Sequence, residues 1–125
     1  MKGKGESKED LLKKSEKLIE EAVKDLEMGC YNKAVSAAYF SVKMTTEHLL
    51  KGLRTTKDDK VANALKRLLL VKVGEKKAEI VRRRFLALFE ARKLADHRPR
   101  MLTEEEAEKF VKMAIELRKI ILEEK

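Results

Sequence analysis

The stretch NKAVSAAYFSVKMTTEHLLKGL, residues 32–53, decides the fold because small side chains recur along one side of a helical pattern. Asn32 is a candidate N-cap for this helix, which we expect to end near Leu53. Small side chains let a neighbouring helix approach closely. The side that carries them consists of Ala34, Ala37, Ala38, Ser41, Val42, Thr45 and Leu49. Residues 32–53 are therefore predicted to form the central helix of a bundle.

The sequence predicts one helix before this stretch and a short one after it. The first begins near Ser7 and ends at Gly29, since glycine often stands just past a helix C-terminus. Its apolar residues repeat every three to four positions, which defines one buried face. After the central helix, residues 59–70 form a short basic segment, and Gly74 separates it from the next helix.

Two further helices complete the pattern. Residues 75–96 carry an apolar stripe, and this helix should end near Asp96 or His97 because Pro99 disfavours helical geometry in the residue before it. Thr103 followed by Glu106 is a capping box that opens the last helix. Short links between long helices favour antiparallel neighbours. We therefore predict an all-α fold, an antiparallel up-and-down four-helix bundle with a short extra helix.

Length and composition limit the class of protein. The 125 residues fit one domain, which we place at residues 7–124 behind a flexible N-terminal tail of residues 1–6. A single cysteine and the lack of a long apolar run or an apolar leader predict a cytoplasmic protein without a membrane span. The absence of glutamine and the dominance of lysine and glutamate are typical of proteins from very hot environments.

The net charge of +8 is concentrated in the middle of the chain. Residues 51–100 contain sixteen lysines and arginines against six acidic residues. Such a local excess favours a polyanion or an acidic protein as partner. The alternative is a lysine-rich surface that only keeps the protein solvated.

The stretch EARKLADHRPRML, residues 90–102, holds the candidate site. Arg92 and His97, with Arg98 and Arg100 directly after, would suit phosphate binding. They would also suit metal-free RNA cleavage, in which the histidine moves protons, the arginine neutralises phosphate charge and the ribose 2′-hydroxyl attacks. This interpretation makes the site a candidate ribonuclease centre.

A structural interpretation of the same residues stays open. Arg92 extends an apolar stripe and has Asp96 four positions on, so the two can form an intrahelical ion pair. His97 near a helix C-terminus interacts favourably with the carbonyl ends as a cation. His48 and His97 are the only histidines, and no zinc-ligand motif surrounds either. We expect neither a metal nor a cofactor.

The whole pattern resembles the HEPN domain family (higher eukaryotes and prokaryotes nucleotide-binding), in particular its small stand-alone prokaryotic members. The resemblance rests on residues 29–53, on LFEARKLADHRP at 88–99 and on TEEEAEKFVKMAIELRKII at 103–121. It implies an antiparallel helical bundle that forms a homodimer and is encoded beside a minimal nucleotidyltransferase as a toxin–antitoxin pair. Active branches of the family are ribonucleases with an arginine, four to six residues, then a histidine.

Carried onto this chain, the resemblance makes Arg92 the phosphate-binding residue and His97 the acid and base. It also implies a supporting polar residue from the second helix, for which Ser41, Thr45 and Glu47 are candidates. The chain departs from the pattern at Pro99, where many toxin members have a tyrosine, and it reads ADH where related members often read ADY. Two functions therefore remain open, a metal-independent endoribonuclease and a non-catalytic module that docks a nucleotidyltransferase or binds nucleotide or RNA.

Overall fold

The computed structural model describes residues 8–50, 57–97 and 101–123, and within these ranges every regular element is a helix. The elements are α1 (Lys8–Glu27), α2 (Tyr31–Leu49), α3 (Asp58–His97) and α4 (Glu104–Leu122). The all-α prediction is confirmed. None of the described helices is both long enough and apolar enough to cross a bilayer.

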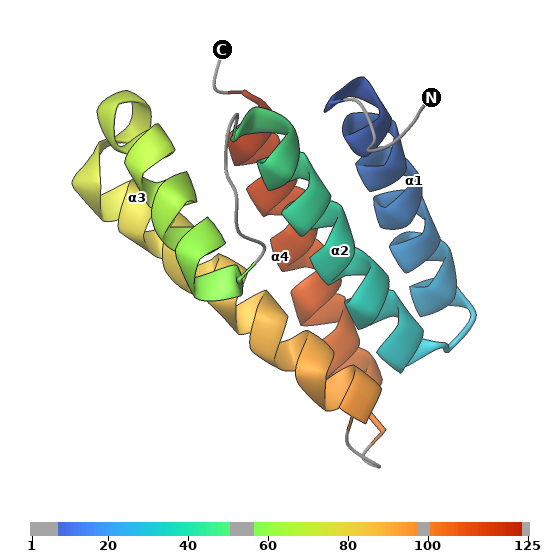
Figure 1. Cartoon of the computed structure of the whole chain (residues 1–125). Coiled ribbons are helices and arrows are strands. Elements are labelled where there is room, and N and C mark those ends of the chain that lie inside the picture. The colour runs from blue at the N-terminus through green and yellow to red at the C-terminus, as the bar shows by residue number, and fades with distance from the viewer. Residues whose placement is uncertain (1–7, 51–56, 98–100, 124–125) are drawn as a thin grey trace.

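A break at Gly74 divides α3 into two arms, residues 58–73 and 75–97. Gly74 has φ +89° and ψ 165°, a conformation that strains any residue with a side chain. The two arms lie side by side, as Figure 1 shows in green and yellow. The first arm is the short extra helix, and α1, α2, the second arm and α4 form the up-and-down bundle.

Helix α2 is the central element, as its small residues predicted. It packs against α1, α3 and α4 and separates most of α1 from α3. The side chains of Ala34, Ala38 and Val42 are fully buried along it. Aromatic and aliphatic residues of the second arm, among them Phe85 and Leu88, complete the same core.

Three helix ends show how local sequence sets the boundaries. Gly29, at φ +81°, ends α1 in a Schellman motif, with Gly29 N–H donating to Leu26 O at 3.2 Å and Cys30 N–H donating to Asp25 O at 2.8 Å. Thr103 and Glu106 form the predicted capping box of α4. The second arm of α3 ends at His97, also as predicted.

The predicted start of α2 was wrong. Cys30 occupies the N-cap position without a side-chain cap, and Asn32 lies inside the first turn. Asn32 instead donates from Nδ2 to Ala95 O at 3.0 Å and accepts from Leu102 N–H at 2.9 Å through Oδ1. Its amide thus ties the end of α3 to the residues that lead into α4. The predicted end near Leu53 lies outside the described residues, within which α2 ends at Leu49.

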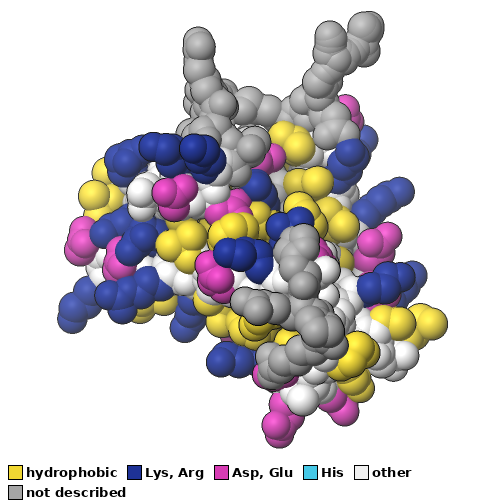
Figure 2. All heavy atoms as spheres, turned by 60° about the horizontal axis from the view of Figure 1, so that its bottom comes forward, with side chains coloured by type: hydrophobic (Ala, Val, Ile, Leu, Met, Phe, Trp, Pro, Cys, Tyr) yellow, Lys and Arg dark blue, Asp and Glu magenta, His cyan; other side chains and the backbone are white. Residues whose placement is uncertain are grey.

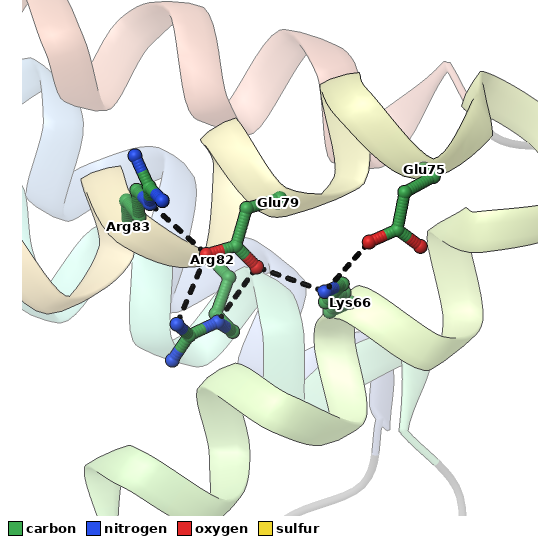
Figure 3. Close-up of polar contacts among 5 residues, drawn as sticks. All are labelled: Lys66, Glu75, Glu79, Arg82 and Arg83. Carbon is green, nitrogen blue, oxygen red and sulfur yellow. Dashed lines mark hydrogen bonds and ion pairs between the residues drawn. The ribbon is translucent and has the colours of Figure 1, made fainter.

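A salt-bridge cluster joins the two arms of α3 (Figure 3). The Lys66 ammonium of the first arm lies 2.9 Å from Glu79 and 3.1 Å from Glu75 of the second. Glu79 also accepts hydrogen bonds of 3.0 Å from the Arg82 and Arg83 guanidinium groups. Hydrogen bonds from Arg82 and then Lys66 hold the pKa of Glu79 well below its usual range. The Glu79 carboxylate that links the arms is therefore ionised at neutral pH.

Candidate functional site

Arg92 lies on the second arm of α3 where the apolar stripe meets solvent. Its guanidinium carbon is 4.9 Å from the ring centroid of Phe40 and 5.6 Å from that of Tyr39, both on α2. The side chain is 26% exposed. Aromatic faces attract a cation at these distances, so two rings and partial burial hold the guanidinium in place.

Asp96 forms the ion pair that the i,i+4 spacing predicted. Arg92 Nε lies 2.9 Å from Asp96 Oδ2, yet the buried Nε–H makes no well-directed hydrogen bond. Asp96 also accepts a long contact of 3.5 Å from Ser36 Oγ. The pair is thus held by charge more than by a directed hydrogen bond.

Arg92 forms part of the wall of an open cleft of about 620 Å³ between α2 and the two arms of α3. The lining combines aromatic and aliphatic surface with cations and carboxylates. It consists of Tyr39, Phe40, Lys43, Lys57, Asp58, Asp59, Leu86, Phe89, Glu90 and Arg92. Flat apolar rings beside ammonium and guanidinium groups match the base and the phosphate of a nucleotide.

A buried polar triad closes one side of this cleft. Tyr39 Oη donates to Asp58 Oδ2 at 2.6 Å, and the Lys43 ammonium lies 2.9 Å from Asp58 Oδ1. The Asp58 side chain is only 3% exposed. Burial, and then the hydrogen bond to Asp58, raises the pKa of the Tyr39 phenol, so it remains protonated. The triad fastens the start of the first arm to α2.

This triad is not apparent from the sequence. Asp58 resembles any acidic residue in the first turn of a helix, where the dipole favours it. Its partners lie on another helix, and Tyr39 is nineteen residues away in the chain. The sequence shows only the i,i+4 spacing of Tyr39 and Lys43, and that spacing is common on a helix.

The three candidate supporting residues of α2 lie on two different sides of that helix. Glu47 is on the cleft side, one turn after Lys43, and burial raises the pKa of its carboxyl against the opposing effect of the Lys43 charge. Ser41 and Thr45 are fully buried, and Ser41 Oγ donates to Ser15 O of α1 at 2.6 Å. Neither has a hydrogen bond to Arg92 among the described contacts.

Ser41 and Thr45 belong to an interior network that α4 completes. Thr45 Oγ1 donates to Ser41 O at 2.8 Å and accepts from Arg118 Nε at 3.1 Å. Arg118 also donates from Nη2 to Ser15 Oγ at 3.1 Å. Burial lowers the pKa of Arg118. The structure therefore brings Ser41 and Thr45 together with Arg118 and not with Arg92.

His97 is the last residue of α3, five positions after Arg92. Its side chain, and all of Arg98 and Arg100, lie outside the described residues. The residues on either side of this segment are tied together by Asn32, which binds Ala95 O before it and Leu102 N–H after it. Within the part of the chain that the structure describes, no cluster of histidine, cysteine or carboxylate side chains could hold a metal ion.

Comparison with protein families supplies the identification. The family model of the HEPN domain matches residues 8–125. The chain belongs to the HEPN family. HEPN domains are typically related to nucleases or to toxin–antitoxin systems, and they often dimerise and pair with nucleotidyltransferases. A comparison with curated proteins finds no matching sequence.

Proposed function

We propose that this HEPN protein binds RNA or a nucleotide through the Arg92 cleft, as one component of a nucleotidyltransferase-linked, toxin–antitoxin-like module. The observation that carries the proposal is the placement of Arg92. Its guanidinium is partly buried, lies over Phe40 and Tyr39, and faces a cleft that also contains Lys43 and Lys57.

The chemistry of the cleft supports a phosphate with an attached base. A guanidinium presents paired N–H donors that match two phosphate oxygens, and partial removal from water strengthens the attraction. Lys57 adds positive charge to the same lining, whereas the charge of Lys43 is paired with Asp58. Phe40 and Phe89 offer ring surface on which a base can stack, a contact that contributes about 1–3 kcal/mol per base.

The first candidate activity is metal-independent RNA cleavage. In this proposal Arg92 neutralises the charge that builds on the phosphate, and His97 removes the proton from the 2′-hydroxyl and returns one to the leaving oxygen. The 2′-oxygen bonds to phosphorus while the bond from phosphorus to the 5′-oxygen breaks. The family spacing of arginine, four residues and histidine supports this assignment.

The second candidate function is a non-catalytic, dimeric module that docks a nucleotidyltransferase. The ion pair between Arg92 and Asp96 favours it, since 2.9 Å is the distance of a structural i,i+4 pair. In this case the segment after Asp96 serves as a docking surface.

The test is cleavage of single-stranded RNA by the purified protein in EDTA, with Arg92→Ala and His97→Ala as test variants. Arg84→Ala is the matched control, because Arg84 is on the same helix and has only a 3.7 Å contact with Glu116. Cleavage that persists in EDTA and in the control but is lost in both test variants would establish the ribonuclease. No cleavage, with binding of RNA lost only in Arg92→Ala, would assign binding without catalysis. If the protein neither cleaves nor binds RNA, the docking function is the one that remains.

A further inference from the structure

The two arms of α3 carry most of the net positive charge of the protein. Residues 57–84 contain ten lysines and arginines against four acidic residues, an excess of six charges out of a net +8 for the whole chain. Figure 2 shows Lys and Arg side chains gathered on the α3 side of the molecule. The charge excess of the sequence is thus a property of one helical hairpin.

Internal ion pairs account for only part of this charge. Lys66, Arg82 and Arg83 contact Glu79, and Arg84 contacts Glu116. Four other basic side chains are exposed and have no ion pair among the described residues. They are Lys60 and Arg67 on the first arm and Lys76 and Lys77 on the second, and we refer to these four residues as the hairpin surface.

The hairpin surface is held in shape and lies on the same two arms whose other residues line the cleft. The cluster around Glu79 fixes one arm against the other (Figure 3), so the four cations stand on a rigid support. The first arm begins at Lys57 and Asp58, which line the cleft. Lys60 and Arg67 are two helical turns apart, roughly 10 Å at a rise of about 1.5 Å per residue, and share a face of the first arm.

We propose that the hairpin surface binds the phosphate backbone of a single-stranded RNA whose other end occupies the Arg92 cleft. This inference shares with the proposed function the assumption that the ligand contains phosphate, and it adds a second contact area outside the cleft. An acidic protein segment would match the four charges alone. RNA matches the charges and also supplies bases for the aromatic rings of the adjoining cleft.

The test is the salt dependence of binding to a fluorescent 2′-O-methyl RNA of twelve nucleotides, which cannot be cleaved by its own 2′-oxygen. The test variant is the quadruple substitution Lys60→Gln, Arg67→Gln, Lys76→Gln and Lys77→Gln. A control with equal charge change replaces Lys13, Lys17, Lys112 and Lys119 by Gln, all exposed on α1 and α4. Thermal unfolding of both variants checks that each remains folded.

Counterion release sets the expected size of the effect. Each phosphate contact to a single strand contributes about 0.7 to the slope of log affinity against log salt, so the slope should fall by about 3 in the test variant and stay unchanged in the control. Equal slopes in the two folded variants would overturn the proposal. So would displacement of the RNA by poly-glutamate of equal length at equal concentration, which would assign the surface to acidic proteins.

Failure of the hairpin proposal and failure of the cleft proposal give different results. Arg92→Ala removes one charge and should weaken binding with little change in slope. If the quadruple variant flattens the slope while Arg92→Ala binds as the wild type does, the hairpin binds RNA and the cleft does not. If Arg92→Ala alone weakens binding, the cleft proposal holds and the hairpin proposal is wrong.

Discussion

Helix α2 carries two polar networks on different sides. They differ in whether their members depend on one shared partner for their hydrogen bonds and ion pairs. The interior network joins Ser41, Thr45, Ser15 and Arg118, and the cleft network joins Tyr39, Lys43 and Asp58. Each hydroxyl of the interior network also donates to a backbone carbonyl, so it keeps a partner whatever Arg118 does. In the cleft network, the Asp58 carboxylate is the shared partner of Tyr39 and Lys43, and it lines the open cleft.

This difference indicates which of the two networks borders an open space that a ligand could enter. The hydroxyls of the interior network are fully buried and donate to backbone carbonyls, so this network specifies packing. The cleft network places charged groups at the border of solvent, beside Arg92 and the aromatic rings. Removing the charged residue of each network should therefore change the free energy of unfolding by different amounts.

The largest stability effect should come from Asp58→Ala. It leaves Lys43 and Tyr39 without their shared buried acceptor, and breaking such a pair costs about 3 kcal/mol. Urea unfolding measures the loss. Asp59→Ala, an exposed neighbour on the same turn, is the control and should change the free energy of unfolding by less than about 0.5 kcal/mol. A loss equal to that of the control would show that the triad does not hold the first arm.

Arg118→Met should cost far less, within about 1 kcal/mol of the wild type by urea unfolding. Replacing a partly buried cation by an apolar side chain of similar length is often neutral, because the desolvation cost of the charge disappears. Ser15 Oγ still donates to Leu12 O, and Thr45 Oγ1 still donates to Ser41 O. A destabilisation as large as that of Asp58→Ala would remove the distinction between the two networks.

Glu47→Gln should have the smallest effect, and a pH-dependent one. Burial raises the pKa of Glu47 in the folded protein above its unfolded value. Ionisation of this carboxyl is then less favourable in the folded state, so its contribution to stability is present below the unfolded pKa and is lost as pH rises through the folded pKa. The variant should be slightly more stable than the wild type at pH 7, and the difference should vanish toward pH 4.

Thermal unfolding from pH 4 to pH 7 follows this difference, with Glu108→Gln, on the exposed side of α4, as control. A difference that grows as pH falls would contradict the assignment of the raised pKa to Glu47.

Much of the fold could be predicted because its signals are local. Gly29, Gly74 and Thr103 each act through their own backbone geometry or a partner three residues away, and the small residues of α2 mark the central helix within a few turns. The Arg92–Asp96 pair was predictable for the same reason. The spacing of the apolar residues also predicted the buried stripe of the second arm of α3.

The rest of the site depends on contacts between distant segments. Asn32 resembled a helix cap, yet its partners Ala95 and Leu102 lie 63 and 70 residues away. The side of α2 that Ser41 and Thr45 occupy follows from the docking of α1 and α4, which no spacing within α2 reveals. Asp58 was missed because its two partners come from another helix.

The most direct test of the cleft as a phosphate-binding site is the affinity of Arg92→Met for a 2′-O-methyl RNA dinucleotide, a ligand too short to reach the hairpin surface. Arg84→Met, about two turns earlier on the same helix, and Arg118→Met, in the interior network, are the controls. We expect binding to be at least about tenfold weaker in Arg92→Met, as for the loss of a charge-assisted hydrogen bond, and unchanged in both controls. Equal affinity in all four proteins would contradict this expectation.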